Sequence, residues 1–472
     1  MPSGISDAAM NQEEILSGKA GAEGVQRLVR GSSSRRLLKQ EVQKMLQEGY
    51  HVGQLRLTRA KFKPGRKLSA YFTFPVSDAK DQASHNAHLA VTWQNELDEA
   101  PQSDNWAQLQ NEANGAGLMP VQCELWRDVP QKGIRLQLWP FDPKFPQLVR
   151  LGSPQYVAEI FSSLGIADQT PEITPIRYRP KERHVLRYEL DSPEAVDRPE
   201  RRLYAKLYTS GEDAARAFGV ASRVVDWLEY KQVGLQGNRP EAISQEDAVI
   251  FYPHAEGIPL SRQLHRSRRW LAKQLHVIGR GLATLHHGPE ALQADLKQND
   301  FSKEAKVVRR ASEHMQILLP DTYQKILEIV NRAEERYSAL PQEQPTFTHA
   351  DFKSDHLLTT PEGITLIDFD TCTLTDPALD LGKFLADLEW WFMLRGLSGV
   401  EDAQAELLNA YSTGEESDPA IHERLERAKL FHVLILVKIV ARRVPIYEKD
   451  WGVRTAQLIE RASQVLAQAQ MV

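Results

Sequence analysis

The sequence predicts an α+β protein in which two β-rich units precede a mainly helical one. Strand-type segments joined by basic, proline-containing turns recur between residues 54 and 258. Segments with helical periodicity dominate from residue 261 onward. A stretch at 348–388 concentrates carboxylates on tight turns. With 42% hydrophobic and 26% charged residues over 472 positions, the chain has the composition of a globular protein with buried cores.

These patterns divide the chain into four predicted parts. They are a disordered N-terminus over 1–30, the cap over 31–150, a second β-rich unit over 151–258 and a mainly helical unit with the carboxylate stretch over 259–472.

The N-terminal part contains few strong signals. Residues 1–30 are polar and rich in small residues, which predicts disorder with a short helix at Asn11–Ser17. Residues 32–48 have helical spacing before a glycine stop. Residues 94–114 are polar and acidic, which predicts an exposed loop, and 142–165 predict a linker and an amphipathic helix.

The helical part shows 3.6-residue periodicity in seven segments. The predicted helices are Leu271–His287, Lys303–Leu318, Pro320–Leu340, Leu379–Arg395, Ala403–Ser412, Pro419–Ala441 and Tyr447–Gln468.

Two similar segments indicate a duplicated β-rich unit. KFKPGRKLSAY at 61–71 and RYRPKERHVLRY at 177–188 both predict a strand, a basic proline turn and a second strand. A second pair follows, LQLWP at 136–140 and VIFYP at 249–253. The turn proline and the later proline are 76 residues apart in the first unit and 73 in the second. This spacing favours duplication over chance similarity between short basic hairpins.

The two units differ at one position that matters for chemistry. LYAKL at 203–207 carries Lys206, whereas LAVTW at 89–93 has Thr92 where that lysine would fall. Lys206 is a candidate phosphate-binding cation, or alternatively a solvent-facing strand lysine. We therefore interpret the first unit as a non-catalytic cap.

The carboxylate stretch has the layout that phosphoryl transfer requires. His349-Ala350-Asp351 precedes a predicted hairpin, whose turn is Pro361-Glu362-Gly363, and Asp368-Phe369-Asp370 follows its return strand. One carboxylate can orient an attacking hydroxyl while another holds a metal ion that bridges phosphates. The alternative is that these aspartates only cap turns.

This stretch resembles the catalytic core of the aminoglycoside phosphotransferase-like family, relatives of choline kinases and maltokinases. The family pattern H-G-D-x-x-x-x-N, I-D-[FW]-[DE] and D-P-x-x-D-L is matched here by HADFKSDH, IDFD and DPALDL. The resemblance implies a protein-kinase-like two-lobe fold, with 151–258 as its N-lobe, 259–472 as its C-lobe and the cap as a degenerate N-lobe. It implies ATP and Mg²⁺ as cofactors. By the same resemblance Asp351 is the catalytic base, Asp368 a metal ligand, Asp370 a possible second metal ligand and Asp380 the residue that orients the catalytic loop.

The chain departs from the family pattern at the second metal ligand. His356 stands where the family has asparagine, and imidazole suits Mg²⁺ poorly. No glycine-rich loop joins the strands of the second unit; a basic turn that includes Arg179 stands there and could contact phosphates. No glutamate stands clearly in place to pair with Lys206.

Two further residues are candidates at the nucleotide. Lys353, two residues after Asp351, could steady the transferring phosphate or point to solvent. HAEGIPL at 254–260 resembles the family's hinge, which places Glu256 at the nucleotide through its backbone.

The predicted function is transfer of the γ-phosphate of ATP to a hydroxyl of a small molecule. The resemblance to maltokinases, which also carry an N-terminal cap, indicates a sugar or aminosugar acceptor. A pseudokinase that acts as a binding or regulatory protein is the first alternative, because of His356 and the missing glycine-rich loop. Phosphorylation of protein serine or threonine ranks last, because the segment between Asp370 and Asp380 is short.

Composition predicts a cytoplasmic protein without nucleic-acid or membrane partners. The net charge of −5 offers no general attraction to nucleic acid. The apolar run at 430–440 is too short and polar to span a bilayer and predicts a buried helix. The two cysteines, Cys123 and Cys372, indicate no disulfide framework, and no signal pattern opens the chain. Neither the acceptor nor the oligomeric state is specified by the sequence.

Overall fold

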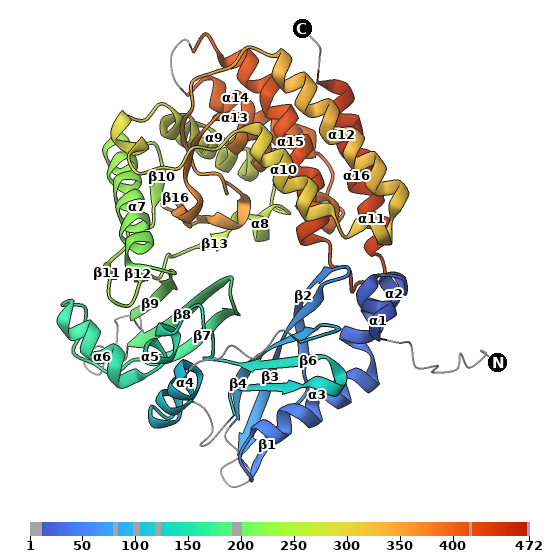
Figure 1. Ribbon diagram of the computed structural model, residues 1–472. Helices are drawn as coiled ribbons and strands as arrows, with labels where there is room; N and C mark the ends of the chain where they lie inside the picture. The colour runs from blue at the N-terminus through green and yellow to red at the C-terminus, as the bar shows by residue number, and fades with distance from the viewer. Residues whose placement is uncertain are drawn as a thin grey trace.

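The computed structural model describes residues 12–78, 84–97, 104–118, 124–190, 201–414 and 418–469. Two antiparallel sheets occupy the N-terminal half, and helices dominate the C-terminal half (Figure 1). The predicted α+β class is confirmed. Cys372 is a free thiol, and Cys123 lies outside the described residues.

The short helix predicted at Asn11–Ser17 is present as α1 (Gln12–Ser17), whereas the disorder predicted around it is wrong for residues 18–30. Helix α2 (Gly21–Arg30) forms there, followed by α3 (Ser32–Met45). Between residues 12 and 30, Ile15, Leu16, Val25 and Val29 are buried, and Leu28 is half-buried against the same core. Tertiary packing therefore orders a segment that its average composition assigns to disorder. Residues 1–11 lie outside the described residues.

The cap sheet contains six antiparallel strands. They are β1 (Tyr50–Val52), β2 (Arg56–Lys63), β3 (Lys67–Asp78), β4 (Ser84–Trp93), β5 (Trp126–Val129) and β6 (Ile134–Leu138), in the order β1-β3-β4-β6-β5 with β2 also paired to β3. Alternate residues of β3 are buried, as expected for a strand with one face on a core. A short 3₁₀ helix, η1 (Pro130–Lys132), connects β5 and β6.

The predicted exposed loop at 94–114 is also partly wrong. Residues 104–115 form helix α4 (Asp104–Gly115), and Leu109 and Ala113, one helical turn apart, are buried. Residues 98–103 lie outside the described residues.

The second sheet has five antiparallel strands. They are β7 (Glu172–Arg179), β8 (Arg183–Leu190), β9 (Arg201–Leu207), β12 (Val249–Pro253) and β11 (Ala242–Ser244), in the order β11-β12-β9-β8-β7. Helices α5 (Gln147–Leu151) and α6 (Pro154–Ser163) pack on one face and share an apolar cluster with it. Helix α7 (Gly211–Lys231) follows β9.

The two sheets share strand order and register. The path β2-β3-β4-β6-β5 in the cap corresponds to β7-β8-β9-β12-β11 in the second sheet. Ser69 pairs with Thr92 in one sheet, and Val185 pairs with Lys206 in the other. Since Ser69 and Val185 each lie five residues after the turn proline, Thr92 and Lys206 occupy equivalent positions.

The second sequence similarity is offset by two residues. Leu138 pairs with Leu89, and Pro253 pairs with Leu203. Leu89 and Leu203 each precede the equivalent Thr92 and Lys206 by three residues, so the position equivalent to Pro253 is Leu138 and not Pro140. A shift of two keeps every side chain on the same face.

The helical part surrounds one long buried helix, α15. The helices are α8 (Leu260–Gln263), α9 (Arg268–His286), α10 (Phe301–Ser312), α11 (Met315–Leu318), α12 (Pro320–Ala339), α13 (Ala378–Arg395), α14 (Val400–Ser412), α15 (Ile421–Arg443) and α16 (Trp451–Gln468), with the 3₁₀ turn η2 (Glu290–Gln293). The helix predicted over 303–318 is divided into α10 and α11. The apolar run at 430–440 lies within α15 and is almost wholly buried, as predicted. Among the described helices, none combines the length and apolar content that a membrane span requires.

Two small sheets carry the carboxylate stretch. One contains β10 (Leu235–Gly237), β16 (Ile364–Leu366), β15 (Leu357–Thr359) and β13 (Ile258–Pro259), and the other pairs β14 (Thr346–Thr348) with β17 (Thr373–Thr375). Strands β15 and β16 are the predicted hairpin. The 3₁₀ turns η3 (Ser354–His356) and η4 (Phe369–Thr371) flank it.

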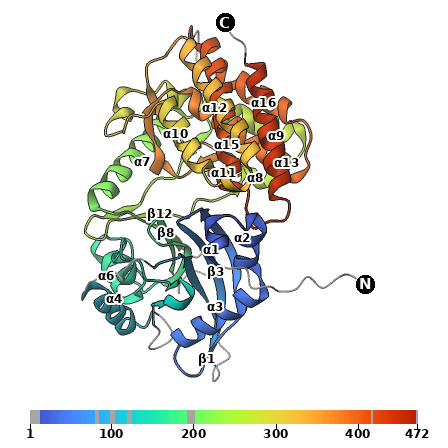
Figure 2. The same cartoon turned by 45° about the vertical axis from the view of Figure 1, so that its right-hand side comes forward.

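The cap touches the helical part as well as the second sheet. Figure 2 shows α2 beside the lower end of the helical part. Arg30 Nη2 lies 2.7 Å from Glu448 Oε1, and Gln26 donates to the carbonyl of Ile446 at 3.1 Å. On the other side, Lys61 Nζ lies 3.0 Å from Glu182 Oε1 in the β7–β8 turn. The cap therefore bridges both lobes.

Candidate functional site

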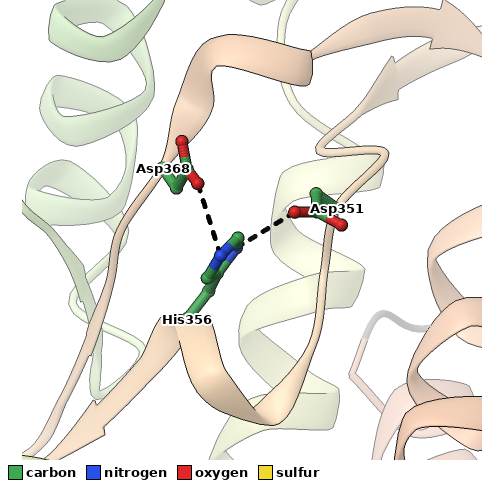
Figure 3. A group of neighbouring side chains, drawn as sticks. All are labelled: Asp351, His356 and Asp368. Carbon is green, nitrogen blue, oxygen red and sulfur yellow. Dashed lines mark ion pairs between the residues drawn. The ribbon is translucent and has the colours of Figure 1, made fainter. Parts of the chain in front are cut away.

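Two parts of the chain that are distant in sequence bring the predicted site residues together. Asp351 follows β14, His356 ends η3, and Asp368 lies between β16 and η4 (Figure 3). One ligand atom from each of these residues lies within 4.8 Å of the others. Lys206 reaches them from β9 of the second sheet. The site thus lies between the sheet and the helical part.

Two residues of the site have left-handed backbone. Ala350 has a φ of 57° and Asp368 a φ of 72°. Neither is glycine, so each conformation is unfavourable and must be held by surrounding contacts.

Asp380 provides the contacts that hold the loop before Asp351. Its buried carboxylate accepts hydrogen bonds from the backbone N–H of His349 at 2.7 Å and of Ala350 at 2.8 Å. The predicted hydrogen bonding between Asp380 and this loop is present, while the catalytic role of the loop stays a prediction. His286, which the sequence analysis did not assign to the site, lies 3.3 Å from the same carboxylate through Nε2.

Asp351 carries a negative charge in the structure. Lys353 Nζ lies 2.6 Å from Oδ2, and Lys383 Nζ lies 2.7 Å from Oδ1. Burial alone would raise the pKa of Asp351, but Lys383, His356 and Lys353 hold it well below its ordinary value. The carboxylate is therefore an acceptor at neutral pH. Lys383, from α13, was not predicted.

Asp368 and Asp370 face two cations of the second sheet. Lys206 Nζ lies 2.8 Å from Asp368 Oδ1 and 3.4 Å from Asp370 Oδ2. Arg183 lies 3.4 Å from Asp368 and 2.9 Å from Asp370. Burial would raise the pKa of Asp368, yet Lys206 and the neighbouring cations hold it well below the ordinary value. Tyr208 donates to Asp370 at 2.6 Å.

His356 lies between the two aspartates. Its Nε2 is 3.3 Å from Asp368 Oδ2, and its Nδ1 is 3.7 Å from Asp351 Oδ2. Burial lowers the pKa of His356 to about 3, so the imidazole is neutral and has a lone pair available. Its Nδ1 is buried without a hydrogen-bond partner among the described residues.

This donor set fits a divalent cation. The carboxylate of Asp368 is an oxygen ligand of the kind that Mg²⁺ prefers, and the carboxylate of Asp351 lies within 4.8 Å of it as a separate acceptor. The neutral imidazole of His356 can complete the set, and a nitrogen donor suits a transition-metal ion better than Mg²⁺.

Of the two arginines in the basic turn, Arg183 reaches the site aspartates and the predicted Arg179 does not. Arg179 ends β7, and its charge interacts chiefly with Arg59 and Arg177 rather than with the site aspartates; burial and these cations lower its pKa to about 10. Arg183, its partner across the hairpin, contacts the aspartates. Residue type alone could not distinguish the two.

Two predictions remain, the position of Glu256 and the lack of a glutamate partner for Lys206. Glu256 is exposed in the connection between β12 and β13, and its role stays a prediction. Among the described residues, Lys206 forms ion pairs with two aspartates and with no glutamate.

Comparisons with known proteins were made by sequence and by structure. The family model described as the phosphotransferase enzyme family matches residues 187–426, slightly more than half of the chain. No curated protein matches the chain.

Among solved structures, a choline kinase from Cryptosporidium parvum is similar at 13% identity and a TM-score of 0.46, covering 66% of this chain and 95% of that one. A choline/ethanolamine kinase family protein from Mesorhizobium loti matches at 16% identity and 0.43, covering 67% and 99%. An aminoglycoside phosphotransferase in complex with streptomycin and ATP matches at 16% and 0.41, covering 67% and 97%.

Proposed function

This chain belongs to the phosphotransferase enzyme family, as its catalytic stretch predicted, and we propose that it transfers the γ-phosphate of ATP to a hydroxyl group of a small molecule. The observation that carries this proposal is the convergence of Asp351, His356 and Asp368 beside Lys206. Phosphoryl transfer depends on positioning and on stabilising negative charge, and these four residues supply both kinds of group.

Asp351 is proposed to orient the attacking hydroxyl and accept its proton. Its carboxylate is ionised, and two lysines fix both of its oxygens. The loop that carries it is fixed in turn by Asp380. An acceptor whose position is fixed in this way can favour one hydroxyl over bulk water.

Asp368, His356 and Asp370 are proposed to hold a divalent metal ion, which would neutralise charge on the nucleotide phosphates when bound. Lys206 and Arg183 are proposed to bind phosphate oxygens from the opposite side. Both cations already lie against the aspartates, so they are within reach of phosphates held there.

For the acceptor, we propose a sugar or aminosugar hydroxyl, on the resemblance to capped maltokinases. The departure at His356 motivates the alternative of a pseudokinase that binds without transferring phosphate. The test below separates the two.

The first test is calorimetric titration of ATP into the wild type and Asp368→Asn, with Mg²⁺, with Mn²⁺ and without metal. Metal-dependent binding that Asp368→Asn weakens at least about tenfold is expected, because the variant removes a charged ligand. Asp321→Asn, which removes the same charge from an exposed site on α12, is the control. Equal binding by wild type and Asp368→Asn would overturn the metal site.

Transfer itself is tested with Asp351→Asn. This variant should bind ATP as the wild type does and lose at least about 100-fold in turnover with an acceptor found by screening sugars and aminosugars. ATP binding without turnover for any acceptor would favour the pseudokinase.

A further inference from the structure

A basic cavity lies outside the site described above. It has a volume of about 540 Å³ and is enclosed between the cap sheet and the β7–β8 turn. Its six cationic lining residues are Lys61, Lys63, Lys67, Arg135, Lys144 and Lys181. Pockets of this size hold metabolite-sized ligands rather than macromolecules.

The charge of the cavity is strongly unbalanced. Glu182 is the single carboxylate among its lining residues, and it is already paired with Lys61 at 3.0 Å. Arg135 is paired with Asp128 at 2.9 Å, and Lys144 Nζ donates to the carbonyl of Lys181 at 3.3 Å. Among the described residues, no carboxylate forms an ion pair with Lys63, Lys144 or Lys181. A chain with a net charge of −5 therefore concentrates positive charge at one recessed place.

The floor of the cavity is polar and neutral. Ser69, Tyr71, Thr92 and Gln137 point from neighbouring cap strands into the same space. Burial raises the pKa of Tyr71 to about 12, so its hydroxyl remains a donor. Hydroxyl and amide groups of this kind suit a polar, hydroxyl-bearing ligand.

The cavity occupies the face of the cap that is equivalent to the nucleotide side of the second sheet. Thr92 is the positional counterpart of Lys206. Lys67 pairs with Lys63 across its hairpin as Arg183 pairs with Arg179. The proposed phosphate-binding cations thus have basic counterparts in the cap hairpin, although Lys206 itself is replaced.

We propose that the cap cavity binds a phosphate-bearing small molecule, with its lysines on the phosphate and its polar floor on the remainder. The comparison with the nucleotide side rests on the proposed function; the cavity, its charge and its floor do not. Lysine side chains converging on a recess are typical ligands for phosphate.

The test uses calorimetry on the full chain without divalent metal, which limits binding at the catalytic site. Inorganic pyrophosphate and glucose 6-phosphate are the probes, and glucose is the uncharged control. Binding of both phosphates without glucose binding is expected. Stronger binding of glucose 6-phosphate would assign an organic phosphate, and stronger binding of pyrophosphate an inorganic one.

The cavity is identified by a double variant, Lys63→Gln with Lys144→Gln. It should weaken probe binding at least about tenfold, since each lost charged hydrogen bond has an effect of that order. Lys39→Gln with Lys132→Gln removes the same charge from exposed cap positions outside the cavity and should bind as the wild type does. Thermal melting of both variants checks that the fold is kept.

Two results would overturn the proposal: no probe binding by the wild type, or equal binding by wild type and the Lys63/Lys144 variant. A third variant, Lys206→Ala, separates this proposal from the previous one. It should lose ATP binding and retain probe binding, whereas loss of both would place the probe at the catalytic cations. Probe binding in a wild type that fails to bind ATP would sustain the cavity and defeat the proposed function.

Discussion

At the scale of single residues, the site is a balance of closely spaced opposite charges. Asp351 is neutralised from the helical side by Lys353 and Lys383. Asp368 is neutralised from the sheet side by Lys206 and Arg183. His356 between them is neutral, so each aspartate is paired with its own two cations. The two carboxylates can therefore serve separate roles.

His356 is expected to set the metal preference. His356→Asn replaces an imidazole nitrogen by an amide oxygen, which Mg²⁺ accepts more readily. The ratio of kcat/KM with Mn²⁺ to kcat/KM with Mg²⁺ should fall by about tenfold or more. An unchanged ratio would mean that His356 does not contact the metal. His265→Asn, at an exposed position, is the control.

The buried side chain of His432 on α15 is expected to make the folded protein less stable at acidic pH. Burial and Arg461 lower its pKa from 6.5 to about 3, and Glu389 lies 4.0 Å away. Since the folded pKa is the lower one, the neutral form stabilises the fold above pH 6.5, and this contribution is lost as the pH falls toward 3, by about 1.4 kcal/mol per pH unit.

His432→Leu should therefore flatten the loss of stability between pH 6 and pH 4, measured by urea unfolding followed by circular dichroism. His422→Leu, on the exposed side of the same helix, is the control. Equal pH slopes for His432→Leu and the wild type would contradict this account.

The sequence pointed to Asp351, Asp368 and Asp380 because all three stand in the motifs that carry the family resemblance. It missed Arg183, Lys383 and His286, whose positions depend on how the hairpin, α13 and α9 pack around those aspartates. Arg183 illustrates the reason: it stands in the basic turn that was recognised, but only the geometry of the hairpin decides which arginine reaches the site.

At the scale of elements, helix α13 connects the loop that carries Asp351 to the core, because α13 crosses α15. Asp380 lies in its first turn and Gly382 shortly after. A Cβ added at Gly382 would lie 2.5 Å from Phe431 Cβ and 2.6 Å from the carbonyl of Ala428. The two helices thus approach so closely that only glycine fits.

Gly382→Ala should destabilise the protein by about 1–3 kcal/mol, because backbone atoms of α15 would have to move. Gly219→Ala in α7 is the matched comparison: its added Cβ would meet only the flexible end of Arg223, at 3.3 Å. That change should stabilise by about 0.5–1 kcal/mol. Thermal and urea unfolding of both variants measure the difference, and equal effects would refute the close crossing.

The predicted strands and long helices agree with the structure because their periodicity is strong. Helices α2 and α4 were missed because each buries only a few apolar side chains, as Leu109 and Ala113 show for α4. In such segments the surrounding core, rather than intrinsic preference, decides the conformation.

At the scale of the whole molecule, the cap contacts both the second sheet and the helical part. The ion pair of Arg30 with Glu448 joins residues 418 positions apart, and that of Lys61 with Glu182 joins residues 121 apart. No local pattern in a sequence specifies such contacts, so the placement of the cap on the helical part could not be predicted.

The boundary between cap and N-lobe can be tested by truncation. Helix α6 belongs to the core of the second sheet, because Phe161 contacts Phe251 and Tyr188 at ring distances of 5.2 and 5.5 Å. A chain of residues 141–472 should therefore melt cooperatively, whereas 166–472, which lacks α5 and α6, should not. Circular dichroism on heating measures this, and equally cooperative melting of both would place the boundary after α6.

The β7–β8 turn lies between the cap cavity and the proposed nucleotide site and contributes residues to both. Lys181 and Glu182 line the cap cavity, and Arg183, the next residue, lies against Asp368 and Asp370. If each compartment holds its proposed ligand, the two equilibria are thermodynamically linked. Whatever factor a phosphate compound in the cap applies to the affinity for ATP, ATP must apply to the affinity of the cap for that compound. Binding of a ligand in the cap cavity would then depend on whether ATP is bound, to the same extent that ATP binding depends on the cap ligand.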